Sequence, residues 1–208
     1  MTERPRVVQV DPMAPAPAGL RVAADVLSAG GAVAFPTETF YGLAAAALDP
    51  ASVKRIFALK GRPDSRPLLV LVDSVAMAET VAHVADPARA LMDRYWPGAL
   101  TLVLPARTIV PSDVTAGTGT LGVRISSHPV AHGLVRMLGE PVTAPSANPS
   151  GLEPPTTADA VVAYFAGGLD LVLDGGPTAG GAPSTVLDMT VEPPKIIRQG
   201  AVVLRAEA

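Results

Sequence analysis

Apolar residues along the chain follow two different spacings, one typical of helices and one typical of strands. In residues 20–27 they recur at helical spacing, and Gly30-Gly31 follows, so we predict a helix that ends at this glycine pair. Residues 32–35 then form a short apolar run, which predicts a buried strand. The pattern therefore changes from helix to strand at the glycine pair.

The same change recurs through the rest of the chain. Further helices are predicted from Asp49-Pro50 to Lys60 with a stop at Gly61, from Asp86-Pro87 to about Trp96, from Pro129 to Gly139, and from a capping box of Thr156 and Asp159 to Phe165. Further strands are predicted at residues 68–72, 99–104, 121–125, 141–144, 169–173, 185–189 and 195–198.

Alternating helices and strands predict an α/β fold with a twisted, mixed or largely parallel sheet and helices on its faces. The length of 208 residues favours one domain. We assign residues 1–19, with their proline-alanine segment, as an extended lead-in and residues 20–208 as a single catalytic domain. Ligands of such sheets gather where strand ends meet loops.

Composition limits the chemistry that the chain can carry. It is 49% hydrophobic but 4% aromatic, so small aliphatic side chains must fill the core. Cysteine is absent, which excludes disulfides, thiolate metal sites and thiol catalysis. A net charge of -3 disfavours a polyanionic partner and leaves a small anionic ligand. No apolar run predicts a signal peptide or membrane span, so we expect a soluble cytoplasmic protein.

Three loops place hydroxyl and amide side chains beside glycine and proline directly after an apolar run. They are PTETFYG (36–42), PSANPSG (145–151) and GGPTAGGAPST (175–185). Such groups suit phosphate oxygens and carboxylates, although the same residue types dominate ordinary turns.

The glycine-rich stretch at 175–181 lacks the lysine of a P-loop. His128 and His132 lack the glutamate of a zinc motif, so we expect a helix cap or packing role there.

Four cations are candidates for anion binding. Lys60 and Arg62 follow a predicted helix, with Arg66 nearby, and they either complement the helix dipole or form a phosphate clamp. Arg124 lies inside the apolar run LGVRI, where an unpaired charge is costly. It therefore has either a structural ion-pair partner or the carboxylate of a ligand.

Six segments in order resemble the YrdC family of threonylcarbamoyl-adenylate synthases, in its short, single-domain bacterial form. They are PTETFYGL (36–43), KGRP (60–63), WPGALTLVL (96–104), LGVRISSHP (121–129), PSANPSG (145–151) and APSTVLD (182–188). The resemblance spans about residues 20–200. It implies an open, twisted mixed sheet with flanking helices and a concave, positively lined ligand cavity.

The resemblance also implies the reaction. L-threonine, bicarbonate and ATP would give threonylcarbamoyl-AMP and pyrophosphate, the first step of threonylcarbamoyladenosine synthesis in tRNA. A downstream threonylcarbamoyl transferase complex would follow, direct tRNA contact is possible, and no membrane is involved. We expect Mg²⁺ to arrive with ATP, with no metal site built by the protein itself. On this resemblance the mechanism would be adenylyl transfer by positioning and charge neutralisation, without a protein nucleophile.

Matched positions assign the site residues that this resemblance implies. Catalysis is assigned to Lys60, Arg62, Ser146 and Asn148. L-threonine binding is assigned to Thr39, Arg124 and Ser184. ATP binding is assigned to Lys60, Arg62, Arg66, Thr120, Ser146, Asn148, Thr156 and Arg198.

The chain departs from the family pattern at two positions. Arg66 stands where many longer members have an asparagine that contacts ATP, and Leu71 stands where they have a histidine that contacts threonine. The threonine contact of that histidine is lost at Leu71, which bears on amino-acid affinity or specificity. Two alternatives stay open: an RNA-binding module without catalysis, and a related enzyme that adenylylates a different carbamate.

Overall fold

A computed structural model of the chain describes residues 4–61 and 67–204. Its strands are β1 (Arg6–Gln9), β2 (Val33–Pro36), β3 (Tyr41–Ala44), β4 (Leu69–Leu71), β5 (Leu100–Pro105), β6 (Thr120–Arg124), β7 (Val142–Thr143), β8 (Leu171–Asp174), β9 (Thr185–Asp188) and β10 (Lys195–Arg198). Its helices are α1 (Pro17–Ser28), α2 (Pro50–Lys60), α3 (Val75–Val81), α4 (Asp86–Tyr95), α5 (Ser112–Thr115), α6 (Pro129–Leu138) and α7 (Ala158–Tyr164).

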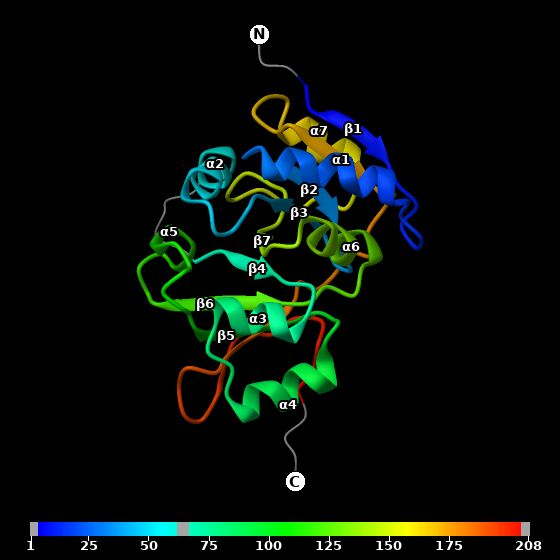
Figure 1. The fold of residues 1–208 in the computed structure, drawn as a ribbon. Coiled ribbons are helices and arrows are strands. Elements are labelled where there is room, and N and C mark those ends of the chain that lie inside the picture. Colours follow the sequence, from blue (N-terminus) through cyan, green and yellow to red (C-terminus); the bar gives the residue numbers. More distant parts are fainter. Residues whose placement is uncertain (1–3, 62–66, 205–208) are drawn as a thin grey trace.

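The strands form two mixed sheets, which confirms the mixed α/β class but divides the strands between sheets (Figure 1). One sheet has four strands in the order β1-β8-β2-β3, and the other has six in the order β10-β9-β5-β6-β4-β7. Isolated bridges from Gly42 to Ser146 and from Ala46 to Val142 tie the chain around β3 to the chain around β7. The two sheets are therefore joined directly by backbone pairing.

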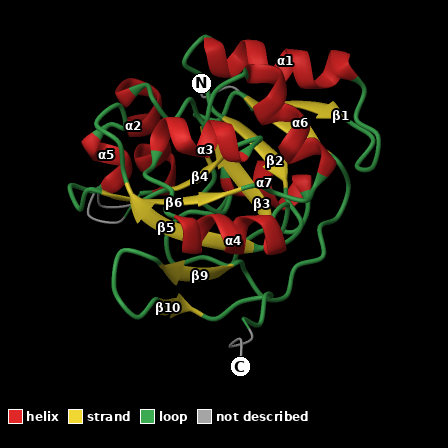
Figure 2. Ribbon diagram, turned by 60° about the horizontal axis from the view of Figure 1, so that its bottom comes forward, coloured by secondary structure: helices red, strands yellow, loops and turns green. Residues whose placement is uncertain are grey.

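Helices cover the sheets through two apolar clusters. Helices α1 and α6 pack together beside the four-stranded sheet, and the absence of a side chain at Gly133 permits their contact: a Cβ there would lie 2.8 Å from Leu20 Cδ1. Helices α3 and α4 bury Ala78, Val81 and Met92 in the cluster that contains the core side of β5 and β6. Figure 2 shows β9 and β10 at the open edge of the larger sheet.

Most predicted helix ends are confirmed, and two caps are wrong. Asp49 caps α2, since its carboxylate accepts from the backbone N–H groups of Ala51 and Ser52, and Gly61 ends the helix with a left-handed φ of 55°. Asp86 is the first residue of α4 and makes no capping hydrogen bond. Thr157, one residue after the predicted Thr156, caps α7.

The segment predicted as an extended lead-in contains one strand and the start of a helix. Residues 6–9 form β1, which pairs in parallel with β8, and α1 begins inside the segment at Pro17. The N–H of Arg6 donates to the Asp170 carbonyl at 3.0 Å and that of Val10 donates to the Asp174 carbonyl at 2.9 Å. These backbone bonds hold a mostly exposed strand that has little apolar pattern. Within residues 4–61 and 67–204, no helix is long and apolar enough to cross a membrane.

Candidate active site

A cavity of about 710 Å³ opens on one face of the six-stranded sheet, a volume in the usual range for small-molecule sites. Side chains alternate between the two faces of a strand, so every second residue of β5, β6 and β9 reaches the cavity. These residues are Thr101, Val103, Thr120, Gly122, Arg124, Val186 and Asp188. The residues between them, such as Leu102, Val123 and Leu187, lie in the apolar core on the other face.

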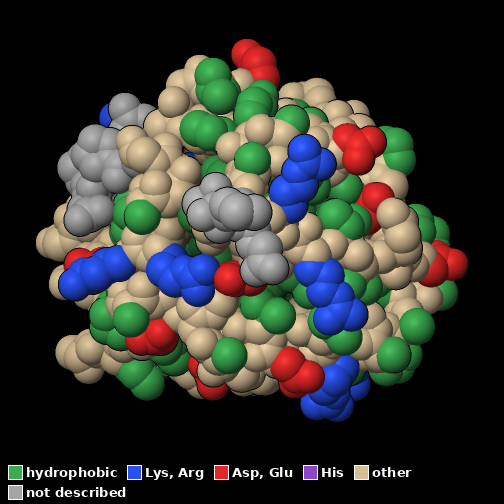
Figure 3. Space-filling model, turned by 90° about the horizontal axis from the view of Figure 1, so that it is seen from above, with side chains coloured by type: hydrophobic (Ala, Val, Ile, Leu, Met, Phe, Trp, Pro, Cys, Tyr) green, Lys and Arg blue, Asp and Glu red, His purple; other side chains and the backbone are tan. Residues whose placement is uncertain are grey.

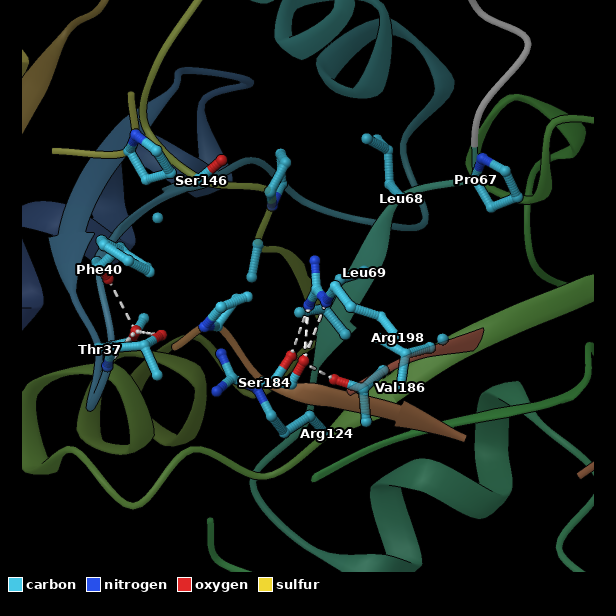
Figure 4. A pocket seen from close by; sticks show the side chains of 18 of the residues that line it. Thr37, Phe40, Pro67, Leu68, Leu69, Arg124, Ser146, Ser184, Val186 and Arg198 are labelled. Atoms are coloured by element: carbon cyan, nitrogen blue, oxygen red, sulfur yellow. Dashed lines mark hydrogen bonds between the residues drawn. The ribbon is translucent and has the colours of Figure 1, made fainter. Parts of the chain in front are cut away.

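The opposite wall comes from the turn between β2 and β3 and from the segment after β7. Figure 4 shows Thr37, Phe40 and Ser146 on this side, facing Arg124, Ser184 and Arg198. Thr37 fixes the turn, because its hydroxyl donates to the Phe40 carbonyl at 2.7 Å and accepts from the Thr39 N–H at 3.2 Å. Thr37 thus stabilises the connection between β2 and β3 at the cavity wall.

The structure brings most of the sequence-predicted site residues together. The predicted residues that line the cavity are Thr39, Lys60, Thr120, Arg124, Ser146, Ser184 and Arg198. Asn148 and Thr156 are not among the lining residues, so their assigned ATP contacts stay predictions. Arg62 and Arg66 lie outside the described residues. Leu71 is buried on the same face of β4 as the lining residue Leu69, but it packs against the cluster of α1 and α6.

Lys60 is buried at the end of α2 and fastens the segment after β7. Its Nζ donates to the backbone carbonyls of Ser146 at 2.6 Å and of Asn148 at 2.7 Å. The Asn148 amide in turn donates to the carbonyls of Pro149 at 3.2 Å and Leu152 at 2.5 Å. Both side chains thus shape the loop that presents Ser146 to the cavity, a role that residue type and spacing do not reveal.

Arg124 is almost fully buried at 3% exposure and forms an ion pair with Glu38. The Ser126 hydroxyl donates to the other carboxylate oxygen of Glu38. Burial lowers the pKa of Arg124, and the charge of Glu38 opposes that shift. A structural partner was one of the two alternatives for Arg124, but sequence reasoning did not identify Glu38, which lies inside the PTETFYG segment.

Arg198 and Ser184 form a second polar group on the cavity wall. The guanidinium of Arg198 donates to the Ser184 carbonyl at 2.9 Å and to the Ser184 hydroxyl at 3.0 Å, and this hydroxyl also lies 3.0 Å from the hydroxyl of Thr101. Burial lowers the pKa of Arg198, and the positive charge of Arg124 lowers it further. The field between the two arginines therefore favours an anion.

Acidic and histidine side chains form no metal cage in the part of the chain that the structure describes. Glu153 and Asp188 line the cavity and offer carboxylates singly. This donor set fits a Mg²⁺ ion that arrives on phosphates, because Mg²⁺ keeps several waters and needs one or two protein carboxylates.

His128 is a helix cap as predicted: its Nδ1 accepts from the Val130 N–H at 3.2 Å. His132 Nε2 lies 2.9 Å from the Asp73 carbonyl oxygen.

The cavity thus offers cations, hydroxyls and backbone groups. Among its described lining residues there is no histidine or cysteine to act as a nucleophile or general base. Such a site can bind anionic ligands, orient them and neutralise charge that develops between them. That chemistry suits group transfer between two bound substrates.

Comparison with known proteins gives concordant matches. The Sua5/YciO/YrdC family model, described as telomere recombination, matches residues 25–200. The threonylcarbamoyl-AMP synthase of Pyrococcus abyssi (strain GE5 / Orsay) is 45% identical over 186 residues, which cover 89% of this chain and 55% of that protein. The threonylcarbamoyl-AMP synthase of Bacillus subtilis (strain 168) is 43% identical over 182 residues, which cover 86% and 53%. The chain spans about half the length of these curated relatives.

A solved structure agrees with these sequence matches. The crystal structure of P. abyssi Sua5 complexed with L-threonine matches with a TM-score of 0.90 and 42% sequence identity, covering 93% of this chain and 57% of that one. The backbone of the two sheets therefore has the arrangement seen in that protein. Since the family model covers well over half of the residues, the chain belongs to the Sua5/YciO/YrdC family.

Proposed function

We propose that this chain is an L-threonylcarbamoyladenylate synthase, an adenylyl-transferring enzyme that uses L-threonine, bicarbonate and ATP. The observation that carries the proposal is the convergence of two residue sets on one cavity. Thr39, Arg124 and Ser184, assigned to threonine, line the same cavity as the residues assigned to ATP: Lys60, Thr120, Ser146 and Arg198. The names of the curated relatives and the threonine bound to P. abyssi Sua5 support it.

The side chains divide the cavity between the two substrates. Arg124 would bind the threonine carboxylate, since a guanidinium is a planar donor that matches carboxylate geometry. The hydroxyls of Ser146 and Thr120 and the guanidinium of Arg198 would contact phosphate oxygens. Lys60 would act partly through the loop that it holds, because its ammonium group donates to the Ser146 and Asn148 carbonyls.

The proposed reaction has two steps that balance. The threonine amine adds to bicarbonate, which gives the N-carboxylate (carbamate) and water. A carbamate oxygen then attacks the α-phosphorus of ATP, the bond from that phosphorus to the bridging oxygen breaks, and pyrophosphate leaves. The cavity residues orient the two reactants in line and neutralise phosphate charge. When Mg²⁺ is bound with ATP, it supplies further neutralisation of that charge.

The biological setting is also part of the proposal. The product is an activated carbamate, so a downstream threonylcarbamoyl transferase complex would pass it to tRNA. We propose that this occurs in the cytoplasm, where ATP and tRNA are both present.

The alternative of an RNA-binding module without catalysis receives less support. Backbone-reading RNA modules present a basic surface, whereas the whole chain has a net charge of -3. Figure 3 shows basic and acidic side chains interspersed on the described part of one face. Steep salt dependence of tRNA affinity, without ATP turnover, is the result that would favour this alternative.

Pyrophosphate release tests the proposal. The protein is supplied with ATP, Mg²⁺ and bicarbonate, together with L-threonine, L-serine or no amino acid. We expect release that requires both bicarbonate and L-threonine. Comparable release with L-serine would indicate a relaxed choice of amino acid, and release with a different amine alone would favour an enzyme for another carbamate. The absence of release with L-threonine would contradict the proposal.

A further inference from the structure

Glu38 is the one acidic side chain that the structure describes in contact with Arg124, and the site assignments leave it without a role. Its side chain is 16% exposed, so the carboxylate is largely removed from water. It accepts hydrogen bonds from Arg124 on one oxygen and from the Ser126 hydroxyl on the other. Both oxygens of the Glu38 carboxylate therefore accept hydrogen bonds from protein side chains.

The turn that carries Glu38 is held rigidly. Thr37 is buried, and its hydroxyl bonds the Phe40 carbonyl and the Thr39 N–H across the turn. The Glu38 side chain therefore projects from a fixed backbone toward β6. Ser126 is also fixed, because its hydroxyl accepts from the His128 N–H at 3.2 Å where α6 begins. The network thus joins the smaller sheet to β6 and to the start of α6.

Arg124 keeps hydrogen-bonding capacity that this network does not use. Its Nε is buried and has no hydrogen-bond partner among the described residues. An unpartnered buried N–H is costly and calls for an explanation, and Arg124 lines the cavity. A ligand oxygen placed there would complete its hydrogen bonding. Glu38 binds the Nη1 end of the guanidinium, so it leaves the Nε edge for that oxygen.

Charge explains why Arg124 needs Glu38. The carboxylate of Glu38 compensates the positive charge of the Arg124 guanidinium, which is almost fully removed from water. A buried arginine without Glu38 would change rotamer or bind a solvent anion, because an isolated buried charge is strongly disfavoured.

We propose that Glu38 is a positioning residue that fixes the Arg124 guanidinium so that its free edge receives the carboxylate of the amino-acid substrate. This inference rests on the function proposed above for the identity of that substrate. Glu38 itself touches Arg124 and Ser126, and it acts on the substrate through Arg124.

The first experiment measures substrate preference by calorimetry in the wild type and in E38A, E38Q and E79Q. L-threonine is compared with L-threoninol, which lacks the carboxylate. We expect E38A to lose about tenfold or more in affinity for L-threonine, the size of one charge-assisted hydrogen bond, while its affinity for L-threoninol is unchanged. E38Q should show a smaller loss of about threefold, since its carbonyl still accepts from Arg124 but it no longer carries the negative charge of the ion pair.

Controls separate positioning from general destabilisation. Glu79 is an exposed partner of Arg89 away from the cavity, so E79Q should match the wild type. In pyrophosphate release, E38A should raise KM for threonine and leave kcat nearly unchanged. A folded E38A or E38Q that keeps the wild-type preference for L-threonine over L-threoninol would overturn the proposal. If E38A does not fold, the preference of E38Q for L-threonine over L-threoninol tests the proposal.

A second readout needs no substrate. The Arg124 side-chain Nε–H signal in NMR spectra of the ligand-free protein is assigned by its loss in R124K. We expect slow hydrogen exchange in the wild type, because this N–H is buried, and exchange at least about tenfold faster in E38A. Unchanged exchange would overturn the positioning role. If the wild type neither binds threonine nor releases pyrophosphate, the proposed function fails, while this signal still decides the role of Glu38.

Discussion

At the scale of single residues, the cavity's cations are already held by protein groups. Glu38 holds Arg124, two backbone carbonyls hold Lys60, and Ser184 holds Arg198. Groups that are fixed before the substrate arrives need little reorganisation when charge develops. Replacing one of these cations should therefore change the local structure as well as substrate binding.

Lys60 allows this expectation to be tested. In K60M the carbonyls of Ser146 and Asn148 lose a charged donor inside the protein, so we expect the free energy of unfolding to fall by about 1–3 kcal/mol. KM for ATP should rise in the same variant, because the loop that carries Ser146 is released. Urea denaturation and pyrophosphate release measure the two effects.

Lys54 provides the matched control on the same helix. It is exposed on α2, so K54M should keep the wild-type stability and the wild-type KM for ATP. A K60M protein that is as stable as the wild type, but that uses ATP poorly, would show that Lys60 acts on phosphate alone. The hydrogen bonds from Lys60 to the Ser146 and Asn148 carbonyls would then not stabilise that loop.

Residue type predicts where the cations lie but not what holds them. Arg124 is recognisable from the sequence because a charge inside an apolar strand needs a partner. Its partner Glu38 is 86 residues away in the sequence. It lies in a loop whose hydroxyl side chains, not its carboxylate, are the predicted ligand groups. Pairing of this kind depends on how two sheets approach each other, and local spacing does not contain that information.

At the scale of elements, local signals explain both the successes and the failures. Helix α2 is predicted at both ends because Asp49 and Gly61 are strong boundary signals. Strand β3 is missed because four residues with a glycine among them resemble the continuation of a loop, and its pairing with β2 supplies the missing stability. Helix α3 spans seven residues and is too short for a clear period, although Ser74 caps it.

The start of α6 gives a pH prediction. Burial lowers the pKa of His128 from its ordinary value of 6.5, and the negative charge of Glu38 opposes this shift. The folded protein thus favours neutral His128, whose Nδ1 accepts the Val130 N–H. Its contribution to stability should be complete above about pH 6.5 and should decline as the pH falls below that value, because the unfolded chain binds the proton more readily.

Urea unfolding at pH 8 and pH 5.5 measures this effect. Asparagine is a good cap that does not titrate, so H128N should lose about 1 kcal/mol less stability than the wild type over this range. His83 is exposed, and H83N should keep the wild-type pH dependence. If H128N and the wild type lose equal stability, the cap does not contribute to acid sensitivity.

At the scale of the whole molecule, the cavity exists because two sheets meet. The larger sheet supplies alternate residues of β5, β6 and β9, and the smaller sheet supplies the turn at residues 37–40. The sequence predicts the alternation of helices and strands, but apolar runs do not specify which strands pair. The division into two sheets, and with it the opposite wall of the cavity, therefore appears first in the structure.

We propose that both substrates react in this one cavity to give an activated carbamate. Mass spectrometry of the nucleotide product formed from ATP, L-threonine and ¹³C-bicarbonate follows that reaction. We predict threonylcarbamoyl-AMP that carries the label in its carbamoyl carbon, together with pyrophosphate. An unlabelled threonyl-AMP, or AMP without any threonine adduct, would contradict the account.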